Sequence, residues 1–349
     1  MRASAGWLSV VHVTSTTATA LTPDNAGGAA TSRATAAAPS PAPAPAQPAP
    51  ATAHPALVGH TVSTQWLADH VGSDDLVILD ATVLQLGGPG EKPSYVNGDE
   101  EYLVHGHVPG AVFADLLTDF SHPDSRLGFV KPTAERFAAA AASVGVDNST
   151  TVVVYDNSVG HCAARLWWLF RAFGHDNVAV LDGGLRKWRA EERPIDLGYV
   201  APRQVGSFTA EERPQFWVDK AYVQSVVAGD ADAVLVCALP RHEFTGQTAY
   251  RARAGHIPGS FSAPATFLIN RDTNELLQFD QLRTFFADAH IPDRKIVTYC
   301  SGGLAAAAAA LAFARLGHPD VAIYDGSLNE WVLDEDAPLV TTYRPEPTN

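Results

Sequence analysis

The 349-residue sequence contains only three cysteines, and they lie far apart. Cys162, Cys237 and Cys300 form no C-x-x-C pair, no zinc-binding set and no disulfide framework. Basic residues are also scarce, because 24 Lys and Arg stand against 38 Asp and Glu, which gives a formal charge of -14. A polyanion binder needs a basic surface, so this balance argues against nucleic acid or an anionic membrane as the main partner. The longest apolar runs fall short of 18 residues, and the sequence therefore predicts no membrane-spanning helix.

The first 56 residues differ in composition from the rest. Their only charged side chains are Arg2, Asp24 and Arg33, and Pro alternates with Ala between Pro39 and Pro50. Such a segment is typical of polyproline-like chain with no face to bury. We expect residues 1–56 to be a disordered extension of a cytoplasmic protein, with an organellar transit peptide as the weaker alternative.

From Leu57 onward, short apolar runs alternate with helical patterns. Continuous apolar runs predict strands that are buried on both faces of a parallel sheet. The predicted strands are 76–80, 151–155, 178–182, 233–236, 295–299 and 321–325, and the predicted helices are 134–144, 163–173, 279–290 and 304–316. This alternation predicts an α/β fold.

The pattern occurs twice. Residues 174–188 and 317–331 match at eight of fifteen positions, and GHVPGA (Gly106–Ala111) pairs with GHIPGS (Gly255–Ser260). A repeat of about 150 residues indicates a duplicated domain, because solenoid repeats are far shorter. We expect domains at 57–193 and 215–340, a linker at 194–214 and a tail at 341–349.

The two halves differ at a position that points to chemistry. Strand 295–299 is followed by Cys300, whereas the matching strand 151–155 is followed by Asp156. The loop after the cysteine consists of Ser301, Gly302, Gly303, Leu304 and Ala305. We expect both glycines to permit positive φ, so that successive backbone N–H groups converge into an anion-binding nest at a helix N-terminus. Such a nest favours thiolate over thiol and predicts a nucleophilic Cys300.

These elements together resemble the two-domain rhodanese family of thiosulfate and 3-mercaptopyruvate sulfurtransferases. The paired GHVPGA and GHIPGS turns, the Cys300 loop and YDGSLNEW (Tyr324–Trp331) carry the resemblance, which covers about residues 60–340. It implies two domains, each built on a five-stranded, mainly parallel sheet, with the active cysteine in the second. It also implies that Cys300 accepts a sulfane sulfur from a small donor as a persulfide, and that cyanide or a thiol removes it.

The loop departs from the best-known members of that family. Their loops read C-R-K-G-V-T for thiosulfate or C-G-S-G-V-T for mercaptopyruvate, and this loop reads C-S-G-G-L-A. The Arg-Lys pair that binds a dianion inside the loop is absent, and Ser301 stands one position earlier than the family serine. A hydroxyl at a helix start explains Ser301 as well as a proton relay does. The resemblance still favours thiosulfate or a related compound as the donor, with 3-mercaptopyruvate as the alternative.

An anionic donor then needs cations from outside the loop. Arg165 lies on the helix after the matching first-half loop, where we expect it to reach the cleft between the domains. Arg241, Arg251 and Arg253 lie between strand 233–236 and the GHIPGS turn. Arg165 and Arg253 are our first choices for binding the donor, followed by Arg241, and a surface or structural ion pair explains each equally well.

Two other protein classes share parts of this pattern. A cysteine-dependent phosphatase needs C-x5-R, and Ala306 at the arginine position excludes it. A non-catalytic rhodanese-like binding module stays an alternative, although the retained Cys300 and the glycine-rich loop favour an enzyme. We expect Cys162 and Cys237 to be structural, no metal or cofactor, and a monomer whose partners are a small sulfur donor and acceptor.

Overall fold

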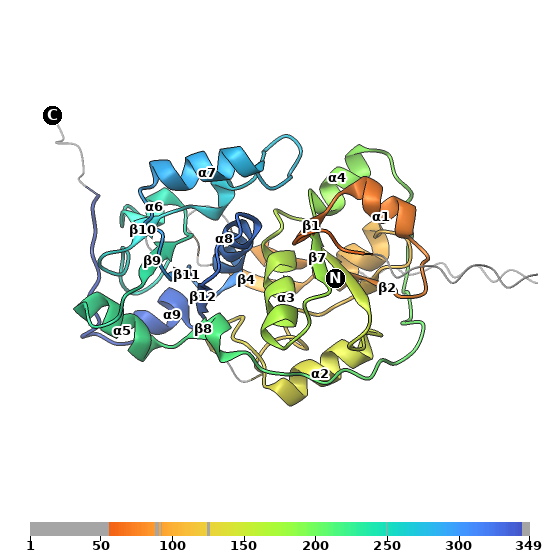
Figure 1. The fold of residues 1–349 in the computed structure, drawn as a ribbon, viewed down its shortest axis with the longest axis horizontal. Helices are drawn as coiled ribbons and strands as arrows, with labels where there is room; N and C mark the ends of the chain where they lie inside the picture. Colours follow the sequence, from red (N-terminus) through yellow and green to blue (C-terminus); the bar gives the residue numbers. More distant parts are fainter. Residues whose placement is uncertain (1–55, 88–90, 92, 124–125, 249, 344–349) are drawn as a thin grey trace, which may run out of the picture. The chain divides into compact units, whose positions relative to one another are not determined.

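Two five-stranded parallel sheets form the framework of the protein, as this computed structural model shows (Figure 1). The structure describes residues 56–343 except 88–90, 92, 124–125 and 249. Apart from Ala56, the expected extension 1–56 lies outside the described residues, as do residues 344–349 of the expected tail. The described residues belong to one compact unit, Thr52–Asn349. The predicted α/β fold with two sheets is confirmed.

The two sheets have the same strand order. The first runs β1–β7–β6–β2–β5 and the second, taken in the matching direction, runs β8–β12–β11–β9–β10, with every pair parallel. The first sheet contains β1 (Thr61–Val62), β2 (Leu76–Asp80), β5 (Val112–Phe113), β6 (Thr151–Tyr155) and β7 (Val178–Leu181). The second contains β8 (Trp217–Val218), β9 (Val234–Cys237), β10 (Phe261–Ser262), β11 (Ile296–Tyr299) and β12 (Val321–Tyr324). Each strand therefore has a counterpart in the other sheet.

Helices flank both sheets, and several begin at a side-chain cap. Ser63, Thr133 and Asp219 each accept the backbone N–H three residues ahead, which stabilises the first turn. The first half has α1 (Thr64–His70), α2 (Ala134–Ser143), α3 (His161–Ala172) and α4 (Gly184–Ala190). The second half has α5 (Lys220–Ala228), α6 (Arg241–Phe244), α7 (Phe279–Asp288), α8 (Leu304–Arg315) and α9 (Ser327–Trp331). An antiparallel hairpin of β3 (Val83–Leu86) and β4 (Ser94–Asn97) belongs to the first half.

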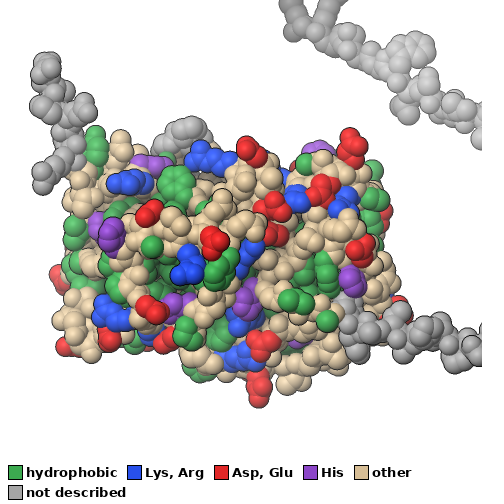
Figure 2. All heavy atoms as spheres, turned by 45° about the horizontal axis from the view of Figure 1, so that its top comes forward, with side chains coloured by type: hydrophobic (Ala, Val, Ile, Leu, Met, Phe, Trp, Pro, Cys, Tyr) green, Lys and Arg blue, Asp and Glu red, His purple; other side chains and the backbone are tan. Residues whose placement is uncertain are grey.

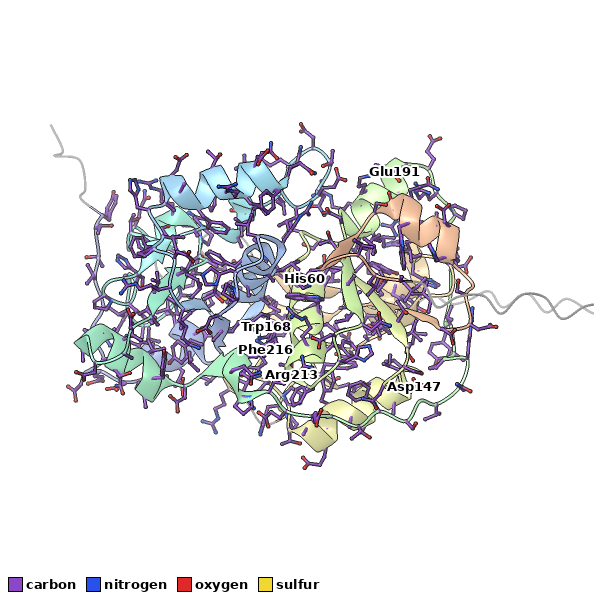
Figure 3. All side chains as sticks on the ribbon, viewed as in Figure 1. His60, Asp147, Trp168, Glu191, Arg213 and Phe216 are labelled. Atoms are coloured by element: carbon purple, nitrogen blue, oxygen red, sulfur yellow. The ribbon has the colours of Figure 1, made fainter. Side chains whose placement is uncertain are left out.

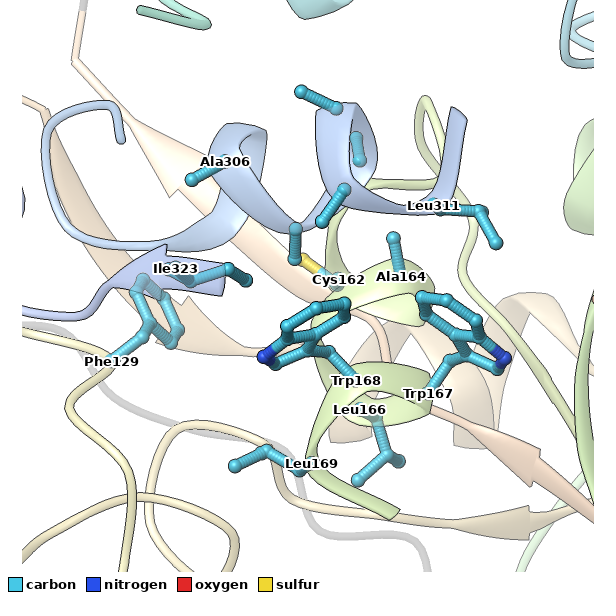
Figure 4. Packing of buried hydrophobic residues seen from close by; sticks show 14 of the residues in the cluster. Phe129, Cys162, Ala164, Leu166, Trp167, Trp168, Leu169, Ala306, Leu311 and Ile323 are labelled. Atoms are coloured by element: carbon cyan, nitrogen blue, oxygen red, sulfur yellow. The ribbon is translucent and has the colours of Figure 1, made fainter. Parts of the chain in front are cut away.

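Helices α3 and α8 pack against each other between the two sheets (Figures 1 and 4). The α8 face is a run of buried alanines, Ala306 to Ala310, whose small side chains allow a close approach. Helix α3 contributes two large side chains, Trp167 and Trp168, and both are fully buried. Both tryptophans therefore belong to the core between the helices and the sheets.

The segment between the halves lies against the first one. Residues 194–213, within the expected linker 194–214, are all described and contain no helix or extended strand. Arg213 pairs with Asp176 at 2.8 Å, and the ring of Phe216 lies 4.8 Å from that of Trp168 (Figure 3). These contacts hold the start of the second half against α3.

No helix in the described part of the chain is both long and apolar enough to cross a membrane. On the face drawn in Figure 2, the described Lys and Arg side chains are interspersed with Asp and Glu. That face therefore presents charges of both signs.

Candidate active site

Cys300 lies between the carboxyl end of β11 and the N-terminus of α8, the edge at which parallel sheets form their ligand sites. Its backbone N–H donates to Ser327 Oγ at 3.2 Å, and its carbonyl accepts the Leu328 N–H at 3.1 Å. The start of α9 thus fixes the cysteine. The Gly303 N–H donates to Cys300 Sγ at 3.2 Å. The loop backbone thus places a hydrogen-bond donor at the sulfur.

The two loop glycines have different roles. We expected positive φ at both, and that is wrong for Gly302, because only Gly303 adopts it, with φ 98°. Gly302 instead provides space, since a Cβ there would lie 3.0 Å from Asn329 Nδ2 and from the Leu127 carbonyl oxygen. The Asn329 side chain donates to that same carbonyl at 2.8 Å, and its backbone N–H donates to Ser301 O at 2.9 Å. The loop is therefore braced from both halves of the chain.

Asp156 occupies the matching position in the first half and shows what such a loop holds. Its carboxylate accepts backbone N–H groups of Ser158 at 2.8 Å, Gly160 at 3.0 Å and Ala163 at 2.9 Å. Gly160 precedes α3 with φ 80°, just as Gly303 precedes α8. The same strand–loop–helix geometry therefore holds a carboxylate in the first half and a thiol in the second.

A pocket of about 610 Å³ opens over Cys300 and is lined by both halves. The first half contributes Tyr95 of β4 and His161 of α3, and the second contributes Glu243 and Arg251. Another hollow, of about 590 Å³, lies beside residues 71–78 of the first sheet, and no cysteine lines it among the described residues. The thiol therefore singles out the first pocket as the candidate active site.

Arg251 is the cation of this pocket, because no other Arg or Lys occurs among the described residues that line it. Its Nη1 donates to Ser301 Oγ at 2.6 Å, and its Nη2 donates to Glu243 Oε2 at 2.9 Å. The Arg251 and Glu243 side chains are each only 10% exposed. Because the Ser301 oxygen accepts from Arg251, its own hydroxyl hydrogen is left to donate to another acceptor.

Arg165 lies behind the loop rather than in the pocket. Its Nη2 donates to Asp325 Oδ1 at 2.6 Å and to the Phe129 carbonyl, and its guanidinium lies 4.9 Å from the centroid of the Trp217 ring. A Cβ on Gly303 would lie 3.0 Å from Arg165 Nη1, so the guanidinium supports the base of the loop. The side chain is 1% exposed.

Arg165→Ala is therefore expected to lower the free energy of unfolding by ~3–5 kcal/mol, because it leaves Asp325 without its buried partner. Chemical denaturation of wild type and variant measures this loss. The control is Arg203→Ala, whose pair with Asp74 is largely exposed and for which ~0–1 kcal/mol is expected. A stable Arg165→Ala protein with a raised KM for the donor would instead place Arg165 in the substrate site.

The other two candidate arginines also lie away from the pocket lining. Arg253 donates to the carbonyls of Asp334 at 2.8 Å and Ala337 at 2.7 Å, and so holds the chain that follows α9. Arg241 is exposed at the start of α6. Of the arginines that we considered, the structure brings only Arg251 to the pocket.

The pocket residues that the sequence analysis missed include Tyr95, His161 and Glu243. Burial raises the pKa of Tyr95 to about 12, and the nearby Cys300 sulfur adds to this, so Tyr95 is a protonated donor at neutral pH. His161 Nε2 is buried and has no hydrogen-bond partner among the described residues, and burial lowers the pKa of His161. Alignment of the two loops places His161 opposite Leu304, and this difference between the halves could have identified His161 from the sequence. No comparable sequence feature marks Tyr95.

The remaining thiols are buried and free. Burial raises the pKa of Cys237 to about 12 and holds the pKa of Cys162 well above its ordinary range. Both sulfurs are therefore protonated at neutral pH, and neither residue lines the pocket over Cys300. These observations favour the structural interpretation of both.

Known proteins are similar to this chain in sequence and fold. The family model of the rhodanese-like domain matches residues 63–191 and 229–334. Over 284 residues, the chain is 33% identical to a 3-mercaptopyruvate sulfurtransferase of Escherichia coli, covering 80% of this chain and 96% of that protein. It is 33% identical over 305 residues to the mitochondrial thiosulfate/3-mercaptopyruvate sulfurtransferase 1 of Arabidopsis thaliana, with coverage of 80% and 77%. The crystal structure of SseA from Escherichia coli matches with a TM-score of 0.68 and 32% identity, over 77% of this chain and 99% of that one.

Proposed function

This chain belongs to the rhodanese family, and on that premise we propose that Cys300 carries a sulfane sulfur from a small donor to an acceptor. The protein is a sulfurtransferase. Thiosulfate and 3-mercaptopyruvate are the proposed donors, and cyanide or a thiol is the proposed acceptor. The observation that carries the proposal is the hydrogen bond from the Gly303 N–H to Cys300 Sγ. In the first half, the matching loop holds the Asp156 carboxylate with the same kind of backbone donor.

The proposed reaction has two steps. The Cys300 thiolate attacks the outer sulfur of thiosulfate, an S–S bond breaks, and sulfite leaves with the bonding electron pair. With 3-mercaptopyruvate the C–S bond breaks instead, and the thiol proton goes to the carbon that becomes the methyl group of pyruvate. In the second step cyanide or a thiolate attacks the terminal persulfide sulfur, and Cys300 leaves as the thiolate.

The loop residues stabilise the charges of these steps. The Gly303 N–H already contacts the sulfur, and the first N–H groups of α8 have no partner within the helix. The helix N-terminus adds partial positive charge. We propose that Ser301, Gly302, Gly303, Leu304 and Ala305 hold the persulfide as the matching loop holds the Asp156 carboxylate.

Arg251 is the proposed anchor for the donor's negative group. Arg251→Gln is expected to lower kcat/KM for 3-mercaptopyruvate by about ten- to a hundredfold, since a charge-assisted hydrogen bond is worth ~1.5–3 kcal/mol. Parallel steady-state assays with both donors measure this effect. The control is Arg253→Gln, which changes an arginine bound to two carbonyls outside the pocket. Equal losses in the two variants would remove Arg251 from the donor site.

The domain boundaries, the oligomeric state and the compartment of the protein are also proposals. We propose domains at 57–193 and 215–340 and a monomer that acts in the cytoplasm. The three free cysteines support a reducing compartment. The small pocket over Cys300 supports low-molecular-weight partners.

A further inference from the structure

We propose that Glu243 determines donor specificity, because it offsets the charge of Arg251 and so makes the pocket favour singly charged sulfur compounds over dianions. This inference rests on the proposed function of Cys300. It adds a specificity-determining residue to the pocket and names the charge class of its substrates.

The first support is the geometry of the pair. Glu243 Oε2 lies 2.9 Å from Arg251 Nη2, and both side chains are 10% exposed. Opposite charges this close and this shielded from water act on an incoming ion as a pair of zero net charge. The pair therefore exerts little net attraction on the charge of an incoming donor, although Arg251 keeps N–H groups that can donate hydrogen bonds.

The second support is the rest of the pocket. Glu91 also lines it, and the described lining residues contain no Lys and no Arg besides Arg251. A dianion that enters therefore finds one guanidinium in the described lining, and that guanidinium is already paired with Glu243.

The third support is the number of Arg251 N–H groups that remain available to a donor. Its guanidinium has five N–H donors, and the contacts to Ser301 Oγ and Glu243 Oε2 use two of them. The remaining N–H groups suffice for one carboxylate. One carboxylate beside the pair is thus satisfied by hydrogen bonds, whereas the second charge of a dianion meets Glu243.

The size and lining of the pocket agree with this charge class. A volume of about 610 Å³ exceeds the needs of a small inorganic ion and falls within the usual ~300–1,000 Å³ range of organic ligand sites. The wall is partly apolar, and it contains Leu86, Leu127, Phe129, Ala238, Leu239 and Leu304. An organic thiol with one carboxylate and an apolar part fits both the charge and the wall.

The direct test is Glu243→Gln. The glutamine amide oxygen can still accept from Arg251 Nη2, so the contact is kept while the negative charge is removed. We expect kcat/KM for thiosulfate to rise about tenfold and kcat/KM for 3-mercaptopyruvate to rise less than about threefold. Glu335→Gln, an exposed carboxylate outside the pocket lining, is the matched control and should change neither. A ratio of the two donors' kcat/KM values that stays within about twofold of wild type overturns the proposal.

A second measurement uses wild-type protein and does not depend on the fold of a variant. 3-Mercaptopropionate carries one carboxylate and mercaptosuccinate carries two, and both are thiols of similar size. We expect mercaptosuccinate to bind about tenfold more weakly as a competitor of 3-mercaptopyruvate. Equal or tighter binding of mercaptosuccinate contradicts the role of Glu243.

The experiments also separate this inference from the proposed function. Mass spectrometry of wild-type protein after incubation with each donor reports whether Cys300 gains sulfur. If Cys300 gains none from either donor, the proposed function fails, and the donor comparison fails with it. If it gains sulfur but the donor ratio ignores Glu243→Gln, only the specificity proposal fails.

Discussion

Cys300→Ser is expected to abolish sulfur transfer, with kcat/KM lowered by about a thousandfold or more for every donor. Serine is a far poorer nucleophile toward sulfur, and an alkoxide is not accessible at neutral pH. Wild-type protein incubated with donor and desalted should gain about 32 Da, the mass of one sulfur atom, whereas the variant should gain nothing. Intact-mass spectrometry combined with steady-state assays measures both.

The matched control uses another thiol of the same chain. Cys162→Ala removes a buried sulfur whose pKa is held well above its ordinary range, so it should keep the mass gain and most of the activity. Cys162 is a sharp comparison because it is the second residue of α3, the helix that matches α8. Sulfur found on the Cys300→Ser protein would assign the carrier role to another cysteine.

The sheets were readable from the sequence wherever a strand is long and buried on both faces. Runs such as 76–80 and 151–155 coincide with β2 and β6. Every residue in these runs is apolar or is the first or last residue of the strand. The two-residue strands β1, β5, β8 and β10 were not predicted, because a pair of residues carries no period. Only their pairing with β7, β2, β12 and β9 identifies them.

The sequence alone could not predict which arginine reaches the pocket. Arg251 and Arg253 lie two residues apart in an irregular segment, where neither helical nor strand periodicity says which side chain faces the sulfur. Arg253 was one of the first choices, yet its N–H groups donate to two backbone carbonyls after α9. The contact from Arg251 to Ser301 depends on the path of that segment, which is a tertiary property.

The repeat was the most informative sequence feature, and a fuller comparison of its two copies would also have identified His161. The comparison of halves identified Cys300 by its difference from Asp156, and the structure shows why the substitution is physically coherent. Both positions receive backbone N–H groups from the start of a helix. The same comparison at His161 and Leu304 marks a histidine in the pocket. Tyr95 comes from a hairpin that has no counterpart among the described residues of the second half, so the comparison could not identify it.

Gly303→Ala is expected to lower kcat/KM by about a hundredfold, because the loop depends on the backbone conformation at this position. A φ of 98° is strained for any residue with a Cβ, and the added carbon would lie 3.0 Å from the buried Arg165 Nη1. Relief of either strain moves the Gly303 N–H away from Cys300 Sγ. Iodoacetamide alkylation across pH should then show a less reactive thiol at neutral pH than in wild type.

The control lies at the other end of the same helix. Gly317 follows α8 with φ 78°, and a Cβ there would meet nothing within 4 Å. Gly317→Ala therefore carries backbone strain of ~1–3 kcal/mol without touching the loop, and it should lower the free energy of unfolding while the alkylation rate of Cys300 stays at the wild-type value. If both alanine variants lost activity in proportion to their loss of stability, the effect at Gly303 would be one of folding. A loss of thiol reactivity confined to Gly303→Ala would instead show that the N–H at this position activates Cys300.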